Sequence, residues 1–150
     1  MSGYVLLKLA HVLLAILAFG YTLSYGVWRG LAGSDPAKIR FTLDGIRRLD
    51  RVANAGYGLL FVTGLAMVFV RGLPITLFWI STSISLWVLV AIVGAVFYSR
   101  VVRRQRTLLD SVGPTDPAYR AADARSTQFG VGVTILVLII VFLMVVKPTP

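Results

Sequence analysis

Four long apolar stretches dominate this sequence of 150 residues, and they contain almost no charged side chains. Each is long enough to cross a hydrocarbon core about 30 Å thick, which takes roughly 20 residues of helix. Only helices or a closed barrel satisfy the backbone there, and barrel strands would alternate polar and apolar residues. The sequence therefore predicts one integral membrane domain over residues 1–150, an all-α bundle of four transmembrane helices. The expected spans cover about residues 4–28, 52–70, 74–99 and 129–146.

Composition supports this class and narrows the chemistry. Hydrophobic residues make up 57% of the chain and charged residues 14%, whereas about a quarter of a soluble domain is charged. No cysteine is present, which excludes disulfides, thiolate metal sites and cysteine nucleophiles. The first apolar stretch lacks a preceding basic segment and is too long for a signal peptide, so we expect a retained helix.

Basic residues are concentrated in two loops, and this asymmetry predicts an orientation. Twelve of the 15 lysines and arginines lie between spans one and two or between spans three and four, as do all six acids. Lysine- and arginine-rich loops face the cytoplasm, so we expect both of these loops inside and both termini outside. The net charge of +9 then indicates attraction to anionic lipid on the cytoplasmic side, and no nucleic acid is expected as a partner.

The two charged loops are expected to be helical rather than slack. Ser34-Asp35-Pro36 is typical of a helix start, and the segment after it either lies on the membrane surface or continues into span two. Span three is expected to run past Arg106 and to end near Gly113. Thr115-Asp116-Pro117 should begin the next helix, and Pro74 should lie in the first turn of span three.

A short pattern recurs where spans two and four begin. The two copies read Arg51-x-x-Asn54-x-Gly56-x-Gly58 and Arg125-x-x-Gln128-x-Gly130-x-Gly132. Amides can hydrogen-bond a neighbouring helix, and paired glycines allow close approach, so we predict that these amides and glycines pack against other helices. Two parallel hairpin repeats, related by an axis along the membrane normal, would explain the match. Coincidence in a chain rich in glycine and arginine is the alternative.

His11 is the only histidine and lies inside span one. It shares a helical face with other small or polar residues, so this face should point into the bundle. The face comprises Tyr4, Lys8, His11, Ala15, Ala18, Thr22 and Tyr25. His11 is interpreted as a buried polar residue bonded across the bundle, as a metal or haem ligand, or as a proton relay.

Two methionines are candidate partners of His11. Met67 and Met144 are expected near the same outer surface. An imidazole with two thioethers would suit copper(I), and a histidine with a methionine opposite would suit haem b. Both methionines are equally open to a plain apolar role, and one histidine cannot form a bis-histidine haem site. We find no acid inside a span, which argues against carboxylate-driven transport.

The segments Leu6-Leu7-Lys8-Leu9-Ala10-His11-Val12-Leu13 and Arg48-Leu49-Asp50-Arg51 resemble an uncharacterised bacterial family. That family consists of small four-helix integral membrane proteins, and the resemblance implies the bacterial cytoplasmic membrane. The Lys8-x-x-His11 start is also distantly similar to copper-resistance-D-like proteins and to haem-b protoporphyrinogen oxidases of bacteria. In those oxidases a first-helix histidine, matched by His11, and a third-helix lysine matter, and span three has no lysine.

Three classes of function remain at this level. A non-enzymatic membrane protein would act through helix packing, as an accessory subunit of a larger energy-converting complex or as a homo-oligomer. A haem- or copper-binding redox protein would use His11. A small-solute carrier is the third class, and the sequence names no substrate for it.

Overall fold

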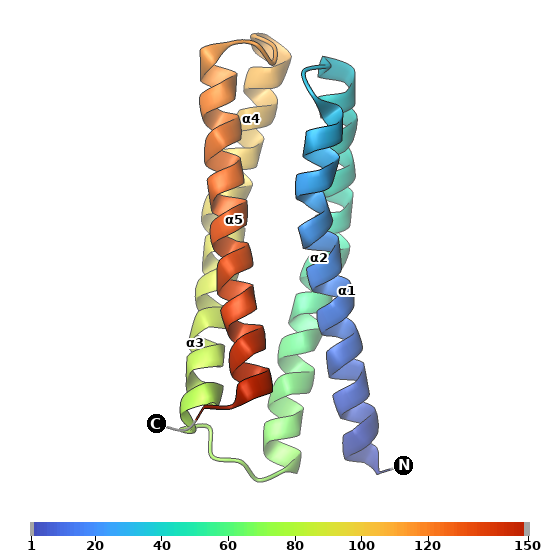
Figure 1. The fold of residues 1–150 in the computed structure, drawn as a ribbon, viewed down its shortest axis with the longest axis vertical. Helices are drawn as coiled ribbons and strands as arrows, with labels where there is room; N and C mark the ends of the chain where they lie inside the picture. The colour runs from blue at the N-terminus through green and yellow to red at the C-terminus, as the bar shows by residue number, and fades with distance from the viewer. Residues whose placement is uncertain (1, 149–150) are drawn as a thin grey trace.

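The computed structural model describes residues 2–148 as a set of long helices arranged in two hairpins (Figure 1). The first hairpin pairs α1 (Gly3–Ala32) with α2 (Pro36–Val70). In the second, α3 (Phe78–Ile92), the π-helical segment η1 (Val93–Tyr98) and α4 (Ser99–Ser111) form one long arm. That arm packs against α5 (Pro117–Val146). The expected all-helical bundle is confirmed, with four helical arms long and apolar enough to cross a membrane among the described residues.

The helix starts next to the charged turns are set by aspartate caps. Asp35 accepts the backbone N–H groups of Ala37 at 2.8 Å and Lys38 at 3.3 Å, and proline follows it at the first helical position. Asp116 accepts the Ala118 N–H at 2.7 Å in the same way. These bonds satisfy donors that a helix start leaves unpaired. Both predicted starts are confirmed, and α2 continues unbroken into the second span.

The third span begins later than expected. Pro74 was expected in its first turn, but α3 begins at Phe78. The Leu77 N–H bonds the Pro74 carbonyl at 3.1 Å, which closes a single turn. Leu77 then has an extended ψ of 131°, so the helix restarts after it. At the far end, α4 stops at Ser111 and Gly113 has a positive φ of 83°, as the sequence predicted for the end of this arm.

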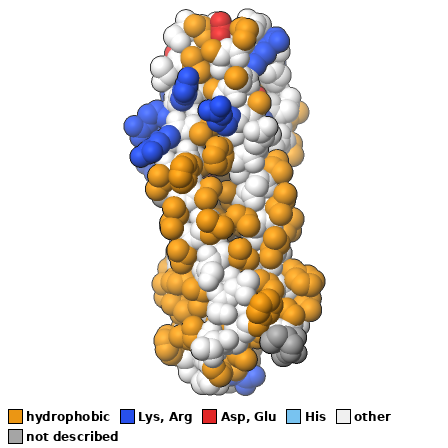
Figure 2. Space-filling model, turned by 90° about the vertical axis from the view of Figure 1, so that its left-hand side faces the viewer, with side chains coloured by type: hydrophobic (Ala, Val, Ile, Leu, Met, Phe, Trp, Pro, Cys, Tyr) orange, Lys and Arg blue, Asp and Glu red, His pale blue; other side chains and the backbone are white. Residues whose placement is uncertain are grey.

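The two ends of the molecule differ in charge. Both termini and the connection between α2 and α3 lie at one end, and the two short turns lie at the other (Figure 1). Lysine and arginine side chains gather toward the end with the short turns, above a broad apolar surface (Figure 2). We call these the terminal end and the charged end.

The hairpins meet most closely at the charged end. A buried cluster there takes residues from both: Ala32, Ile39, Leu43, Leu109 and Tyr119. Along the apolar part, close backbone contacts lie almost entirely within each hairpin. The rings of Phe61 on α2 and Trp87 on α3 stack across the gap, with centroids 4.2 Å apart. Large side chains therefore bridge the hairpins in the span region, and close packing joins them at the charged end.

Candidate functional site

The small and polar face of α1 lies along α2, as the sequence predicted. Contacts run from one end of the hairpin to the other. They join Tyr4 to Arg71, His11 to Thr63, Ala18 to Gly56, Thr22 to Tyr57 and Tyr25 to Asp50. From Tyr4 to Tyr25, the partners run back from Arg71 to Asp50, as expected for an antiparallel pair. His11, Thr22 and Tyr25 therefore find polar partners inside the hairpin, whereas Lys8 of the same face is exposed.

His11 is held in one orientation by Thr63 and Gly64. Its Nδ1 lies 2.9 Å from the Thr63 Oγ1. The Thr63 hydroxyl has one hydrogen, and this hydrogen donates to the carbonyls of Leu59 or Leu60 in its own helix, at 2.8 and 3.0 Å. With the hydrogen placed in this way, the Thr63 oxygen accepts from His11, an assignment that puts the imidazole proton on Nδ1 and leaves a lone pair on Nε2. A Cβ at Gly64 would lie 3.1 Å from the His11 Cε1, so the ring needs glycine beside it.

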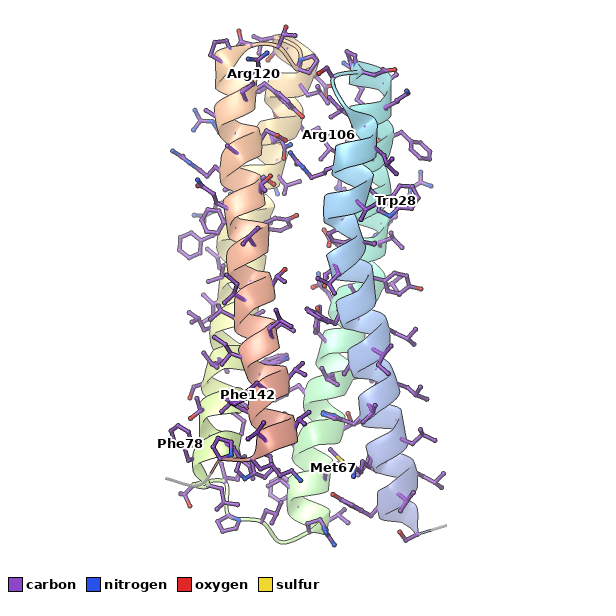
Figure 3. All side chains as sticks on the ribbon, in the orientation of Figure 1. Trp28, Met67, Phe78, Arg106, Arg120 and Phe142 are labelled. Carbon is purple, nitrogen blue, oxygen red and sulfur yellow. The ribbon has the colours of Figure 1, made fainter. Side chains whose placement is uncertain are left out.

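The two candidate methionine ligands of His11 lie on different hairpins. Met67 lies one helical turn from Thr63 toward the terminal end and extends toward α1 (Figure 3). Met144 lies in the last turn of α5, on the other hairpin. Among the described residues no hydrogen bond joins either sulfur to His11, and no three His, Asp or Glu side chains form a metal-binding group. The contacts of the described residues fix one imidazole nitrogen, and the roles of His11, Met67 and Met144 as copper or haem ligands stay predictions.

A second polar cluster, centred on Asp50, was missed in the sequence. Of the six acids, Asp35 and Asp116 cap helices and Asp44, Asp110 and Asp123 form ion pairs. Among the described residues Asp50 pairs with no cation, and its carboxylate accepts the Tyr25 hydroxyl at 2.8 Å. The phenols of Tyr57 and Tyr98 lie within electrostatic range of this carboxylate. Residues of α1, α2 and η1 thus surround one half-buried acid.

The spacing of α2 held the signal for this cluster. Asp50 continues the helical face of the buried Ile39, Leu43 and Ile46, and Ala53 follows on the same face. From the sequence alone, Asp50 is expected in a charged loop, where Arg48 and Arg51 are its neighbours. Both arginines are exposed, so the acid and the arginines point in different directions.

Cross-hairpin polar pairs hold the charged end together. Asp123 on α5 pairs with Arg29 on α1 and accepts the Gln105 Nε2 at 2.6 Å. Arg106 pairs with Asp44, and the Arg40 Nε lies 2.9 Å from the Asp110 carboxylate. Gln105 is 0% exposed, and its Oε1 has no partner among the described residues. These pairs link helices that are distant in sequence, so local patterns did not indicate them.

The predicted helix-packing residues divide into two groups. A Cβ at Gly56 would lie 3.3 Å from the Ala18 Cβ, so Gly56 sits at a close approach of α1 and α2. Around Gly58, Gly130 and Gly132 there is open space within 4 Å of such an atom. The side chains of Asn54 and Gln128 are exposed, and neither makes a hydrogen bond within the described part of the chain. A role for these five residues in helix packing stays a prediction.

Fold, apolar surface and charge distribution together define a small integral membrane protein of four spanning helices. A family model described as "Predicted integral membrane protein (DUF2269)" matches residues 5–148, and the chain belongs to this family. The predicted membership of an uncharacterised membrane family is thereby confirmed. No curated protein and no solved structure matches the chain. The similarity to copper-resistance-D-like proteins and to haem-b oxidases stays a prediction.

Proposed function

We propose that this protein is a non-enzymatic membrane component that acts by packing its helices against other membrane helices. It serves as a homo-oligomer or as an accessory subunit of a larger energy-converting complex in the bacterial cytoplasmic membrane. Its charged end faces the cytoplasm and both termini face outward, which the excess of lysine and arginine at that end supports.

The exposed amides of Asn54 and Gln128 carry this proposal. Each lies near the start of a membrane span, and Gly58 and Gly132 follow one turn further in, with open space beside them. An amide that faces lipid without a partner is unfavourable. A neighbouring helix that approaches at the glycine can supply that partner, with about 0.6–2 kcal/mol for an interhelical hydrogen bond. Within the described residues of a single copy, neither amide has a protein partner.

The test is to replace both amides with leucine and to measure association. The wild type and an Asn54→Leu, Gln128→Leu double variant would be extracted from native membranes and compared by native mass spectrometry and in-membrane cross-linking. We expect the wild type to form an oligomer or to co-purify with a membrane partner. The double variant should lose this association. Thr127→Val is the matched control, because the Thr127 hydroxyl already donates to the Asp123 carbonyl at 3.1 Å. A wild type that is a lone monomer without a partner would refute the proposal.

The redox hypothesis keeps one specific observation in its favour, the free lone pair on the His11 Nε2. Thr63 holds the proton on Nδ1, and this is the arrangement of many metal-bound histidines. An absorption spectrum and metal analysis of the purified protein test whether His11 binds haem or copper. A haem band or stoichiometric copper that is absent from His11→Gln would establish the redox role. A colourless, metal-free protein that retains no haem after reconstitution would end it.

A further inference from the structure

A cavity of about 210 Å³ opens between the two hairpins at the charged end. Both hairpins contribute to its wall, through the end of α1, the first turns of α2, the turn before α5 and the first turns of α5. Its polar lining consists of Arg29, Ser34, Thr42, Tyr119, Arg120 and Asp123. None of these residues takes part in the proposed packing sites or in the His11 contacts.

The ionised groups of the lining leave one positive charge uncompensated. The Asp123 carboxylate is occupied by Arg29 and by the Gln105 amide. The Arg120 guanidinium forms no ion pair or hydrogen bond within the described residues. Arg120 lies near the end of α5 that faces the turn between α1 and α2 (Figure 3). A planar guanidinium without a partner at the mouth of a cavity suits an oxyanion.

Thr42 gives independent evidence for a ligand. Its side chain lines the cavity and is only 7% exposed, yet its hydroxyl bonds nothing within the described chain. Threonines inside helices commonly donate to a carbonyl one turn earlier. Thr22, Thr63, Thr107, Thr127 and Thr134 all do so here. The half-buried Thr82 is the other exception within the described helices. The Thr42 hydroxyl is not one of the fully buried unpaired atoms of the described residues, so a ligand or water in the cavity can reach it and supply a partner.

Tyr119 adds a second donor to the same wall. It is 5% exposed, and its hydroxyl oxygen receives only a long bond of 3.5 Å from Gln105. The hydroxyl hydrogen is therefore available to a ligand. One guanidinium and two hydroxyls, carried by α2 and α5, supply several hydrogen-bond donors for the oxygens of a phosphate group.

An apolar depression of about 400 Å³ adjoins the cavity and shares Ala32 and Thr42 with it. Trp28, Leu31 and Phe41 line it, and Leu31 and Phe41 are 74% and 73% exposed. Tryptophan is typical of the membrane interface, so the depression begins where lipid headgroups lie.

We propose that the cavity binds a phosphate group, held by Arg120, Thr42 and Tyr119, beside the neutral pair of Arg29 and Asp123. Two sources share this chemistry, the headgroup of an anionic phospholipid and free phosphate. The adjoining apolar depression favours the lipid, because an acyl chain can lie on it while the phosphate occupies the cavity. This site is independent of the proposed helix packing.

The experiment uses the full chain, purified in detergent and stripped of lipid. Native mass spectrometry measures retention of phosphatidylglycerol and of phosphatidylcholine, and titration calorimetry measures inorganic phosphate. Phosphatidylglycerol retained preferentially would assign the site to a lipid headgroup, and binding of inorganic phosphate alone would assign it to free phosphate. Either result supports the proposal, and no binding of any of the three probes overturns it.

Two substitutions test the residues. Arg120→Gln and Thr42→Val should each weaken binding about tenfold, the usual effect of losing a hydrogen bond to a charged group. Thr42→Val should leave thermal stability unchanged, because the hydroxyl has no partner within the described chain. Arg104→Gln, which changes an exposed arginine of α4 outside the cavity lining, is the control for general electrostatic attraction. Equal weakening by Arg104→Gln, or no effect of Thr42→Val and Arg120→Gln, would overturn the proposal.

Discussion

At the level of single residues, the close approach of α1 to α2 depends on two glycines of α2. Gly56 receives the Ala18 methyl group, and Gly64 receives the edge of the His11 ring. Because the edge of the His11 ring fits beside Gly64, its Nδ1 can reach the Thr63 hydroxyl. Without water in the surroundings, this bond satisfies two polar groups that would otherwise face an apolar medium.

Gly64→Val should therefore destabilise the hairpin. The added side chain would press on the His11 ring and break its bond to Thr63, at a cost of about 1–3 kcal/mol, the usual range for overpacking. Thermal unfolding in detergent would measure the loss. Gly20→Val is the matched control, because a Cβ at Gly20 meets open space. Equal stability of the two variants would show that His11 does not need this close contact.

At the level of elements, each hairpin has a short turn that an aspartate cap closes. Asp35 and Asp116 occupy equivalent positions, each with proline at the start of the following helix. The turns before them contain Gly33 and Gly113, both with positive φ. This repeated arrangement lets two long helices reverse direction within a few residues, and it occurs at the same end of the molecule in both hairpins.

Removal of a helix cap should lower the free energy of unfolding more than removal of an exposed charge nearby. We expect Asp35→Ala to destabilise the protein by about 1 kcal/mol, because two backbone donors lose their partner. Hydrogen exchange of the first turn of α2 should rise in parallel. Asp110→Asn is the comparison, since its pair with Arg40 is about half exposed and worth at most about 1 kcal/mol. A larger effect for Asp110→Asn than for Asp35→Ala would contradict this assignment.

The whole molecule is two hairpins that are joined mainly at one end. The charged end carries the buried cluster and all three ion pairs found among the described residues. In the span region, the stack of Phe61 and Trp87 bridges the hairpins. Lipid-facing apolar residues gain little from packing against each other, because lipid is equally apolar. The buried cluster and the polar contacts at the charged end are therefore the main forces that hold one hairpin against the other.

A double-mutant cycle on Arg29 and Asp123 should measure this coupling. These side chains are only 24% and 33% exposed, so we expect an interaction of about 1–2 kcal/mol. The Arg40–Asp110 pair, at 54% and 51% exposure, should give under about 1 kcal/mol. Unfolding of Arg29→Gln, Asp123→Asn and the double variant supplies the first cycle. Coupling near zero for the first pair would show that packing alone joins the hairpins.

The orientation of the molecule is directly testable because the chain has no cysteine. Single cysteines at Ser34 and Ser111 should resist a membrane-impermeant maleimide in intact spheroplasts and react in inverted vesicles. A cysteine at Thr76, in the connection between α2 and α3, should behave in the opposite way. The reverse labelling pattern would mean that the basic turns face outward, contrary to the positive-inside rule.

The sequence by itself determined the class, the spans and the helix boundaries near the charged turns. Long apolar runs are compatible with few folds, because unpaired backbone groups are unfavourable in lipid. Capping by Asp35 and Asp116 marks the two helix starts. The predicted start of α3 was wrong. The helix begins only after Leu77, which has an extended backbone, and no residue near Leu77 signals that conformation in the sequence.

Only the tertiary structure decided how the hairpins meet and which polar groups share a site. The pairs of Arg29 with Asp123 and of Tyr25 with Asp50 join residues on different helices. Helical spacing shows which face a residue occupies, but it does not show which helix covers that face. Thr42 lines a cavity that both hairpins form, so its unpaired hydroxyl could be recognised only from the tertiary structure. Hydrogen bonds within a helix, such as caps, depend on residues that are neighbours in the sequence. Contacts between helices depend on the register and distance of the helices, which only packing sets.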